Sequence, residues 1–428
     1  MSQPVDLIIH NAGQVCTLPA QEGGPQRGSS LGTLGLITDG AVAIRDGLIV
    51  EVGTTAAIRA HFSAQATIDA AGRAVVPGFV DPHTHLIYAG DRAAEFEMRI
   101  AGVSYMDIMA AGGGINSTVR ATRAAGLEEL IAGAHRRLDA MLALGTTTAE
   151  VKTGYGLNLE TEIRMLEAIA ALDRMHPIDL VPTFLPAHAV PPEYAGRPDE
   201  YVDLVVSQMI PAAAAWYRSS HFATQGTPFF IDVFCEAGVF DLEQTRRVLE
   251  AGIAHGMAVK AHVDEFETLG GVGLGVALGA VSLDHLDVTP AEDRAQLAAS
   301  GAVGVVLPAV TFNLGSAHFA DARALVDAGA ALAIATDINP GSAPCPSMPL
   351  VMAIACRYQR LTPAEALAAA TINAAHAIGL GGRIGSLEPG RQADLLLLDE
   401  PDYRHLAYQF GGNIVHSVIK RGQIVHGG

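Results

Sequence analysis

The feature that most constrains the fold is an alternation of short apolar runs with longer segments of helical character through the middle of the chain. Strands that alternate with helices build a parallel sheet from βαβ units. Eight such runs within roughly 310 residues predict an α/β fold, a (β/α)8 TIM-like barrel with insertions. The runs are Ala74–Val80, Thr146–Val151, Asp179–Leu185, Phe229–Phe234, Ala258–Ala261, Ala280–Leu283, Gly304–Leu307 and Ala331–Ala335.

Both ends of the chain have a different pattern, in which short β-type runs are separated by turns. Near the N-terminus, Asp46-Gly47 predicts a hairpin turn between Ala41–Ile44 and Leu48–Val50. Near the C-terminus, Leu395–Leu398 precedes two runs that meet across Arg421-Gly422. Neither end is large enough to bury a core alone, so we expect one small β-sandwich built from both termini. The predicted limits are 1–75 and 381–428 for the β-sandwich and 76–380 for the barrel.

Composition and charge exclude several classes of partner. Half of the residues are hydrophobic and 17% are charged, as in a compact enzyme. The formal net charge of −18 disfavours nucleic acid and anionic membrane surfaces, although one local arginine can still bind a small anionic substrate. No apolar run is long enough to span a membrane, the N-terminus lacks a secretory pattern, and the four scattered cysteines fit reduced thiols. We therefore expect a cytoplasmic protein with a small-molecule substrate.

Chemically reactive residues follow the apolar runs, where barrels of this kind place their active sites. A single histidine beside a strand is more often a hydrogen-bonded structural residue than a ligand, but placement of several at one face of one barrel is hard to reach by accident. The candidates, in chain order, are His83, His85, Lys152, Tyr155, His188, Cys235, Glu236, His262, Glu265, His285, Asp337 and Asn339.

The pair His83 and His85 predicts a metal site, because side chains at i and i+2 share one face of a strand. With His262 and Asp337 they make three imidazoles and one carboxylate, a set that suits a divalent metal ion with room for water. Such an ion lowers the pKa of water towards ~7, so that a metal-bound hydroxide becomes the expected nucleophile.

Two further residues are predicted to move protons at this point. Glu265, three residues after His262, is placed to take and relay a proton. His285 can orient or protonate groups nearby and stabilise a developing oxyanion. The natural target is a carbonyl-type carbon bonded to nitrogen.

A second metal ion is the less favoured interpretation. Barrel hydrolases with two ions usually bridge them with a carboxylated lysine at the end of the fourth strand. The strand count puts Lys152 at the second strand, while the fourth carries Cys235 and Glu236. Bridging by either of these two residues is left open, and one metal ion is expected.

Longer motifs resemble the amidohydrolase superfamily, and within it the imidazolonepropionase family, over nearly the whole chain. The superfamily resemblance rests on the segment Pro77-Gly78-Phe79-Val80-Asp81-Pro82-His83-Thr84-His85 and the β-flanked barrel. The narrower resemblance rests on Tyr88–Arg92, Glu95–Arg99, Tyr105–Met109, Gly112–Ile115, Lys152–Leu157, Phe184–His188, Asp232–Glu236 and Thr336–Gly341.

This resemblance implies hydrolysis of the ring amide C–N bond of 4-imidazolone-5-propanoate to N-formimidoyl-L-glutamate, the third step of histidine degradation to glutamate. It also implies one Zn²⁺ or iron ion per subunit, held by His83, His85, His262 and Asp337, and suggests a homodimer. The implied substrate contacts are Arg92, Tyr155, His188, Glu265, Asn339, Gly341 and Ser342, where Ser342 replaces a common Thr and still supplies a hydroxyl.

The chemistry of the side chains agrees with several of these roles, although each residue could instead have a purely structural role. Arg92 can bind the propionate carboxylate with its fork of N–H donors, or can form an ordinary surface ion pair. Tyr155 can bond the tail or ring, or simply cap the packing of its loop. Asn339 can present an amide to the substrate, or start a turn before Pro340. His188 can donate to a ring oxygen.

Two other functions are possible for such a site, and a sequence feature argues against each of them. A deaminase acting on a purine, pyrimidine or related ring would use the same metal ion and Glu265, but has little use for a buried Arg92. A non-catalytic scaffold should have lost ligands, yet all the proposed ligands are present. The run Gly112–Gly114 is not a phosphate loop, because it lacks the Gly-Lys-Ser/Thr ending, and a flexible loop near the site mouth is expected.

Overall fold

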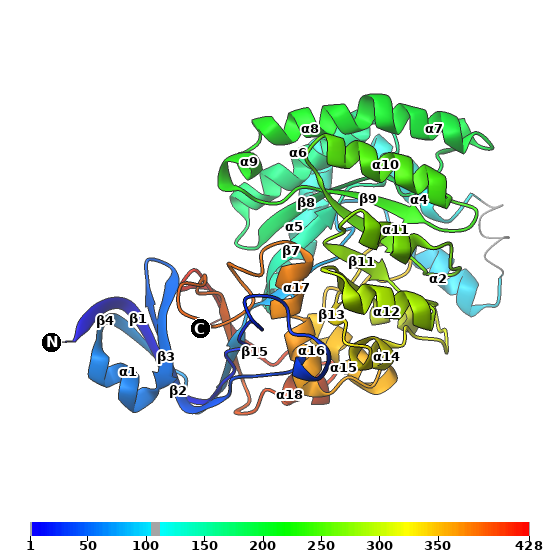
Figure 1. Cartoon of the computed structure of the whole chain (residues 1–428). Coiled ribbons are helices and arrows are strands. Elements are labelled where there is room, and N and C mark those ends of the chain that lie inside the picture. Colours follow the sequence, from blue (N-terminus) through cyan, green and yellow to red (C-terminus); the bar gives the residue numbers. More distant parts are fainter. Residues whose placement is uncertain (1, 104–111, 428) are drawn as a thin grey trace.

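Eight parallel strands in sequential order form the wall of a barrel (Figure 1). The computed structural model describes residues 2–103 and 112–427. The barrel strands are β6 (Phe79–Asp81), β7 (Thr146–Lys152), β8 (Asp179–Ala187), β9 (Phe230–Cys235), β10 (Ala258–Val263), β11 (Ser282–His285), β12 (Val303–Val306) and β13 (Ala331–Ile334). The predicted (β/α)8 architecture is therefore confirmed, with seven of the eight expected runs shifted by only a few residues.

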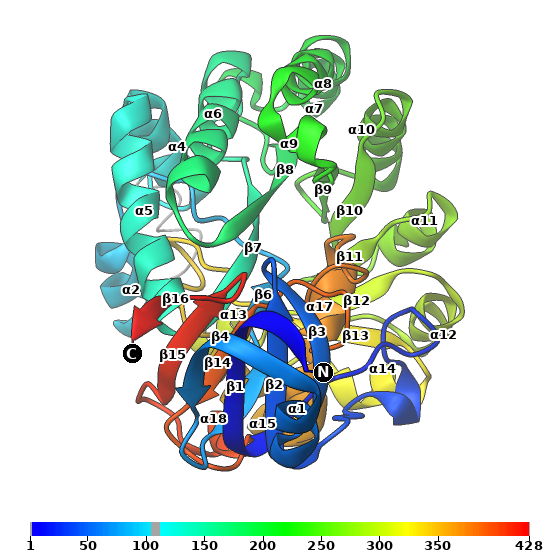
Figure 2. The ribbon, with the colours of Figure 1, turned by 90° about the vertical axis from the view of Figure 1, so that its left-hand side faces the viewer.

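Helices surround this wall and cover its outer face (Figure 2). They cover the apolar side chains on the outer face of the strands. Together the helices and strands enclose the largest hydrophobic core of the protein. In chain order they are α2 (Ala93–Ile100), α4 (Ile115–Ala124), α5 (Leu127–Ala143), α6 (Leu159–Met175), α7 (Pro198–Leu204), α8 (Ile210–Ser219), α9 (His221–Gln225), α10 (Leu242–Ala254), α11 (Gly271–Ala277), α12 (Ala291–Ala299), α13 (Pro308–Asn313), α14 (Ala322–Asp327), α15 (Met348–Tyr358), α16 (Pro363–Ala369) and α17 (Ile372–Ala377).

Strands from both termini build a second, mixed sheet beside the barrel (Figure 1). Its members are β1 (Gln3–Val15), β2 (Ile37–Arg45), β3 (Leu48–Thr54), β4 (Phe62–Asp69), β5 (Ala74–Pro77), β14 (Leu395–Leu398), β15 (Val415–Lys420) and β16 (Gln423–Gly427); α1 (Thr55–His61) and α18 (His405–Tyr408) accompany them. The expected joint β domain is confirmed, as is the turn at Asp46-Gly47, where both residues have positive φ. The limits 75/76 and 380/381 remain predictions.

Two predicted elements are interrupted in the structure. The run Ala74–Val80 is wrong as one strand, because β5 pairs with β14 in the terminal sheet while β6 pairs with β7 in the barrel. The chain changes sheets at Gly78, where any Cβ would overlap the side chain of Thr147. The alanine-rich stretch from Pro363 to Ala377 predicts a single core-packing helix, but the structure divides it into α16 and α17 at Thr371, whose backbone leaves the helical region.

The barrel closes at the ends of its first and last strands. Beyond β6 and β13, the amide of Asp337 donates to the carbonyl of His83 at 3.1 Å, and the amide of His85 donates to the carbonyl of Ile338 at 3.0 Å. These backbone bonds join the segments that carry three of the four predicted metal ligands. The fold therefore fixes the relative positions of His83, His85 and Asp337 through the main chain.

Two remaining predictions concern the motif Tyr105–Met109 with the glycine run that follows it, and the membrane. The motif Tyr105–Met109 lies outside the described residues, whereas the run Gly112–Gly114, where a loop is expected, directly precedes α4. Among the described residues, no helix combines the length and the apolar character needed to cross a bilayer.

A buried ion-pair network joins the terminal sheet to the barrel. The ammonium of Lys420 in β15 donates to the carbonyl of Thr147 at 2.8 Å and pairs with Asp179 and Asp394, both at 2.7 Å. Burial disfavours the ionised form of Asp179, but Lys420 and Arg421 outweigh it and hold the pKa of this carboxyl below its usual range. The lysine therefore bridges the two sheets.

Replacement of this lysine should weaken the junction. We expect Lys420→Met to destabilise the protein by about 3 kcal/mol, because it leaves two carboxylates without their buried cation. Arg421→Ala is the control: its half-exposed side chain pairs with the same Asp179, and its loss should cost at most about 1 kcal/mol. Thermal unfolding of both variants checks this, and equal melting temperatures would contradict it.

Candidate metal centre

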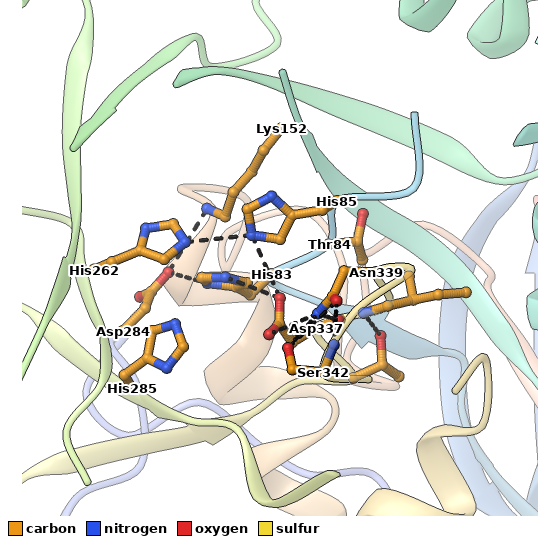
Figure 3. A network of polar contacts seen from close by, with 12 residues as sticks. His83, Thr84, His85, Lys152, His262, Asp284, His285, Asp337, Asn339 and Ser342 are labelled. Atoms are coloured by element: carbon orange, nitrogen blue, oxygen red, sulfur yellow. Dashed lines mark hydrogen bonds and ion pairs between the residues drawn. The ribbon is translucent and has the colours of Figure 1, made fainter. Parts of the chain in front are cut away.

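Three histidines and one aspartate converge at the C-terminal end of the barrel (Figure 3). His83 and His85 follow β6, His262 lies in β10, and Asp337 follows β13. The Nε2 atoms of His83 and His85 each lie 3.4 Å from Oδ1 of Asp337, and Nε2 of His262 lies 3.3 Å from Nε2 of His85. The structure thus brings together all four of the predicted ligands.

The spacing and chemistry of these four donors fit a divalent metal ion. Two ligands that bind one tetrahedral ion at about 2.0–2.1 Å lie about 3.3 Å apart, which matches the distances between these donors. Nε2 of His83 and Oδ1 of Asp337 are buried and have no hydrogen-bond partner among the described residues. Burial lowers the pKa of His83 and His85 well below the ordinary value, so both imidazoles are neutral, as metal ligands must be.

Two buried aspartates fix the orientation of the ligand histidines. Nδ1 of His83 lies 2.7 Å from Oδ2 of Asp284, and Nδ1 of His262 lies 3.0 Å from Oδ1 of Asp232. A carboxylate at Nδ1 favours the tautomer that carries its proton there and leaves the lone pair of Nε2 available. Both rings therefore present an acceptor atom to the centre.

His285 and Glu265 lie together beside the ligands. Nδ1 of His285 is 3.5 Å from Oε2 of Glu265 and 3.8 Å from Oδ2 of Asp287. Burial, with Asp287 and Asp337 nearby, raises the pKa of Glu265 well above its ordinary value. A carboxyl group with a raised pKa can hold a proton near neutral pH, which is what a proton-relay group requires.

His285 can also reach the centre itself. One ligand atom each of His83, His285 and Asp337 lies within 4.8 Å of the others, so His285 is a further potential donor. Its φ of 82° is in the left-handed region, and that of Leu286 is 62°. Two successive non-glycine residues in this region are strained, and such strain persists where the surroundings determine a side-chain position.

The residues proposed for a second metal ion have other partners. The carboxylate of Glu236 accepts from the amides of Phe266 and Glu267 at 2.9 and 3.0 Å, so it holds the loop that carries Glu265. Burial raises the pKa of the Cys235 thiol to about 11, which keeps it protonated. The two convergent donor groups among the described residues share His83 and define one centre.

Arg92 lies at the N-terminus of α2, next to the loop after β13. Its Nε donates to Oε2 of Glu95 at 2.8 Å, and its guanidinium occupies the space where a Cβ of Gly341 would be. Glu95 also accepts from the amide of Gly114 at 3.2 Å. Arg92 therefore forms an ion pair, which is the role predicted as the alternative to binding the substrate carboxylate. The same pair directs the guanidinium toward Gly341.

Tyr155 and His188 border the centre on the side of His85. The rings of His188 and His85 stack with centroids 4.7 Å apart, and the ring of Tyr155 is 5.9 Å from His85. Nδ1 of His188 bonds the carbonyl of Gly154 at 3.1 Å. Burial, then His262, lowers the pKa of His188 to about 3, so this ring is neutral.

A buried carboxylate anchors the loop of Tyr155. Glu162 in α6 accepts from the amides of Gly154, Gly156 and Leu157, at distances from 2.7 to 3.2 Å. Asn158 caps the same helix by accepting from the amide of Thr161. The first turn of α6 thus determines the shape of residues 153–157.

The loop after Asp337 is held by Asn339. Its Oδ1 accepts from the amides of Gly341 and Ser342 at 2.8 and 2.7 Å, and its Nδ2 donates to the hydroxyl of Ser342 at 2.9 Å. Nδ2 also lies 3.2 Å from Oδ2 of Asp337. Asn339 therefore shapes a turn and orients a ligand, and its contact with substrate remains a prediction.

Sequence reasoning missed several residues that the site depends on. Asp232 and Asp284 orient ligands, Glu162 anchors a loop, and Asp287 faces His285. A usable signal existed for the first two, because Asp232 is a charged residue inside an otherwise apolar barrel run and Asp284 directly follows such a run. Glu162 gave no such signal, since an acidic residue in the first turn of a helix is common.

Comparisons with known sequence families match the chain to amidohydrolases. Models described as Amidohydrolase family match residues 240–425 and 66–123, and one described as Imidazolonepropionase-like composite domain, bacteria, matches residues 40–62. The imidazolonepropionase of Chloroflexus aggregans is 58% identical, with 99% of each chain covered. The imidazolonepropionase of Symbiobacterium thermophilum is 48% identical, covering 99% of this chain and 98% of its own.

Solved structures share the fold at low sequence identity. A zinc-bound adenosine deaminase from Xanthomonas campestris superposes with a TM-score of 0.71 at 22% identity, covering 99% of this chain and 93% of its own. The guanine deaminase of E. coli gives a TM-score of 0.70 at 16% identity, covering 98% of this chain and 99% of its own. At this identity the likeness establishes the architecture alone.

The anchor of the Tyr155 loop can be tested by hydrogen exchange. Glu162→Gln replaces one acceptor oxygen by an NH₂ group that cannot accept, so we expect faster exchange at residues 154–157, by about tenfold. Glu160→Gln, an exposed change in the same turn, is the control and should leave exchange unchanged. Mass-spectrometric exchange measures both, and equal protection of the loop in the two variants would refute the anchoring role.

Proposed function

The chain belongs to the imidazolonepropionase family of the amidohydrolases, and from this premise we propose how its residues divide the reaction. The protein hydrolyses the ring amide C–N bond of 4-imidazolone-5-propanoate, giving N-formimidoyl-L-glutamate, in histidine degradation. The observation that carries this conclusion is the convergence of His83, His85, His262 and Asp337 in a chain that matches imidazolonepropionases over 99% of its length.

We assign His83, His85, His262 and Asp337 as the ligands of one divalent metal ion per subunit, either zinc or iron. When bound, such an ion supplies Lewis acidity, which polarises a carbonyl and lowers the pKa of a coordinated water. Burial raises the pKa of Asp337 well above its ordinary value, although Lys152 opposes this. A cation beside Asp337 favours its ionised form, so the carboxylate and the metal ion stabilise each other.

Glu265 and His285 are assigned to proton transfer. Glu265 takes a proton from the attacking water and delivers it to the ring nitrogen as the C–N bond breaks. His285 lies between this carboxyl group and the ligands, where its ring can donate to the oxygen that gains negative charge. Glu236 keeps Glu265 in place through the amides of the two following residues.

Substrate contacts are assigned to the residues that border the centre. Arg92 binds the propionate carboxylate, because its guanidinium is aimed at the loop of Gly341 by Glu95. Tyr155 and His188 contact the ring or tail beside His85. The assigned contacts are Arg92, Tyr155, His188, Glu265, Asn339, Gly341 and Ser342.

A deaminase is the less supported alternative. The deaminases among the structural neighbours share the barrel, and a metal ion with a carboxyl group serves both reactions, since each adds water to a trigonal carbon bonded to nitrogen. The imidazolonepropionases of Chloroflexus aggregans and Alkaliphilus metalliredigens are 58% and 44% identical to this chain. The cation at Arg92 separates the two functions, because a neutral nucleobase has no carboxylate for it to bind.

Location and assembly are part of the same proposal. The four cysteines are free thiols, which supports a cytoplasmic location. A homodimer is proposed from the family resemblance, and light scattering of the purified protein would determine the mass in solution.

A substrate panel tests the function. We expect turnover of 4-imidazolone-5-propanoate and none of cytosine, guanine or adenosine. Glu265→Gln should lower kcat by at least about 10²-fold while stoichiometric metal remains bound, because it removes proton transfer and leaves the four ligands intact. Ammonia release from the nucleobases alone, or protein purified without chelator that carries no metal, would argue against the assignment.

The carboxylate contact is tested through KM. Arg92→Ala should raise KM for 4-imidazolone-5-propanoate about tenfold or more with a smaller change in kcat, because a charged hydrogen bond to the tail is lost. Arg120→Ala, which removes an exposed arginine that bonds the carbonyl of Gly112, is the control. If both variants keep the wild-type KM, the role of Arg92 in binding the tail is wrong.

A further inference from the structure

Lys152 lies completely buried at the end of β7, beside His85 and His262, and the reaction described above does not use it (Figure 3). Its ammonium donates to Oε1 of Glu150 and to Oδ2 of Asp232, both at 2.8 Å. Oδ2 of Asp284 is 3.8 Å away. One cation therefore lies among three carboxylates, all of them fully buried.

Two of these carboxylates are the ones that orient the ligand histidines. Asp232 directs Oδ2 at Lys152 and Oδ1 at Nδ1 of His262, so its two oxygens serve different partners. Oδ2 of Asp284 lies 2.7 Å from Nδ1 of His83. Lys152 thus reaches two of the three ligand histidines, His83 and His262, through one intervening carboxylate each.

The placement of the strands explains why one lysine can serve both aspartates. Asp232 belongs to β9 and Asp284 to β11, the neighbours of β10 on either side, while Lys152 comes from β7 across the barrel interior. Inward-facing residues of different strands meet in the interior. Without a central cation, these buried like charges would repel each other and turn away from the histidines.

A bridging role for Lys152 itself does not fit these contacts. The ammonium donates to two carboxylates, so its nitrogen is occupied as a cationic donor. The other buried lysine of the interior, Lys260, bonds Oγ of Ser282 at 2.5 Å and lies 3.3 Å from Oδ2 of Asp284. Lys260 therefore faces only Asp284, the partner of His83, whereas Lys152 also contacts Asp232, the partner of His262.

We propose that Lys152 is a positioning residue for the metal centre: by holding Asp232 and Asp284 against Nδ1 of the two histidines, it keeps both Nε2 lone pairs directed at the metal ion. This rests on the ligand assignment made above. The lysine does not touch the metal ion or the substrate. Its effect is on the tautomer and orientation of two ligands, and hence on metal affinity.

Zinc titration of the metal-stripped full-length protein, in competition with a chromogenic chelator, tests the proposal. Lys152→Met should weaken zinc binding by about 10–100-fold, the range seen when outer partners of ligands are lost. Lys152→Arg, which keeps a cationic donor, should recover most of the affinity. Lys420→Met is the matched control, because it also removes a buried, paired lysine but lies at the junction of the two sheets. Its zinc affinity should stay within twofold of wild type.

A second variant keeps the test decisive if Lys152→Met does not fold. Glu150→Gln/Lys152→Met removes the cation together with one carboxylate, so the net buried charge is unchanged while Asp232 and Asp284 lose the cation between them. Zinc should bind this variant about tenfold or more weakly too, and ring ¹⁵N shifts of His83 and His262 should show mixed tautomers. Wild-type affinity in a folded variant that lacks Lys152 would overturn the proposal. Absence of zinc binding by the wild-type protein would instead refute the ligand assignment.

Discussion

Pairing of buried charges is the condition on which this structure depends. The barrel interior holds the cations of Lys152 and Lys260 and several carboxylates out of contact with water, which is unfavourable for each group alone. The cost is offset because both carboxylates that bond Nδ1 of a ligand histidine, those of Asp232 and Asp284, also face a lysine. The result is a set of imidazoles whose Nε2 atoms lie close to one another.

Much of this could be predicted from the sequence because strand geometry is regular. A period of two places His83 and His85 on one face, and the rule that barrel sites lie at strand ends brought His262 and Asp337 to the same point. The same period places Lys260 two residues before His262. Because strand geometry is regular in this way, both the barrel architecture and the four proposed ligands could be predicted from the sequence.

The rest could not be predicted because it depends on contacts between distant loops. The acceptor role of Glu162 exists only once residues 153–157 fold back over the start of α6, and Glu236 reaches a loop some thirty residues later. The strand before His83 was expected to run from Ala74 to Val80 without a break, since apolar character alone does not show that the chain leaves one sheet and enters another at Gly78. For Asn339 the sequence predicts a turn as one of two roles, but it gives no sign that the amide also lies against Asp337.

The closure of the barrel has a consequence for its mechanical integrity. The first and last strands are joined at the active-site end by backbone bonds between the residues around His83 and those around Asp337. An ion that binds both side chains spans the same junction and acts as a cross-link between segments that lie far apart in the chain. Its binding energy would then stabilise the barrel against separation of the first and last strands. Loss of the ion would therefore lower the stability of the fold as well as the activity.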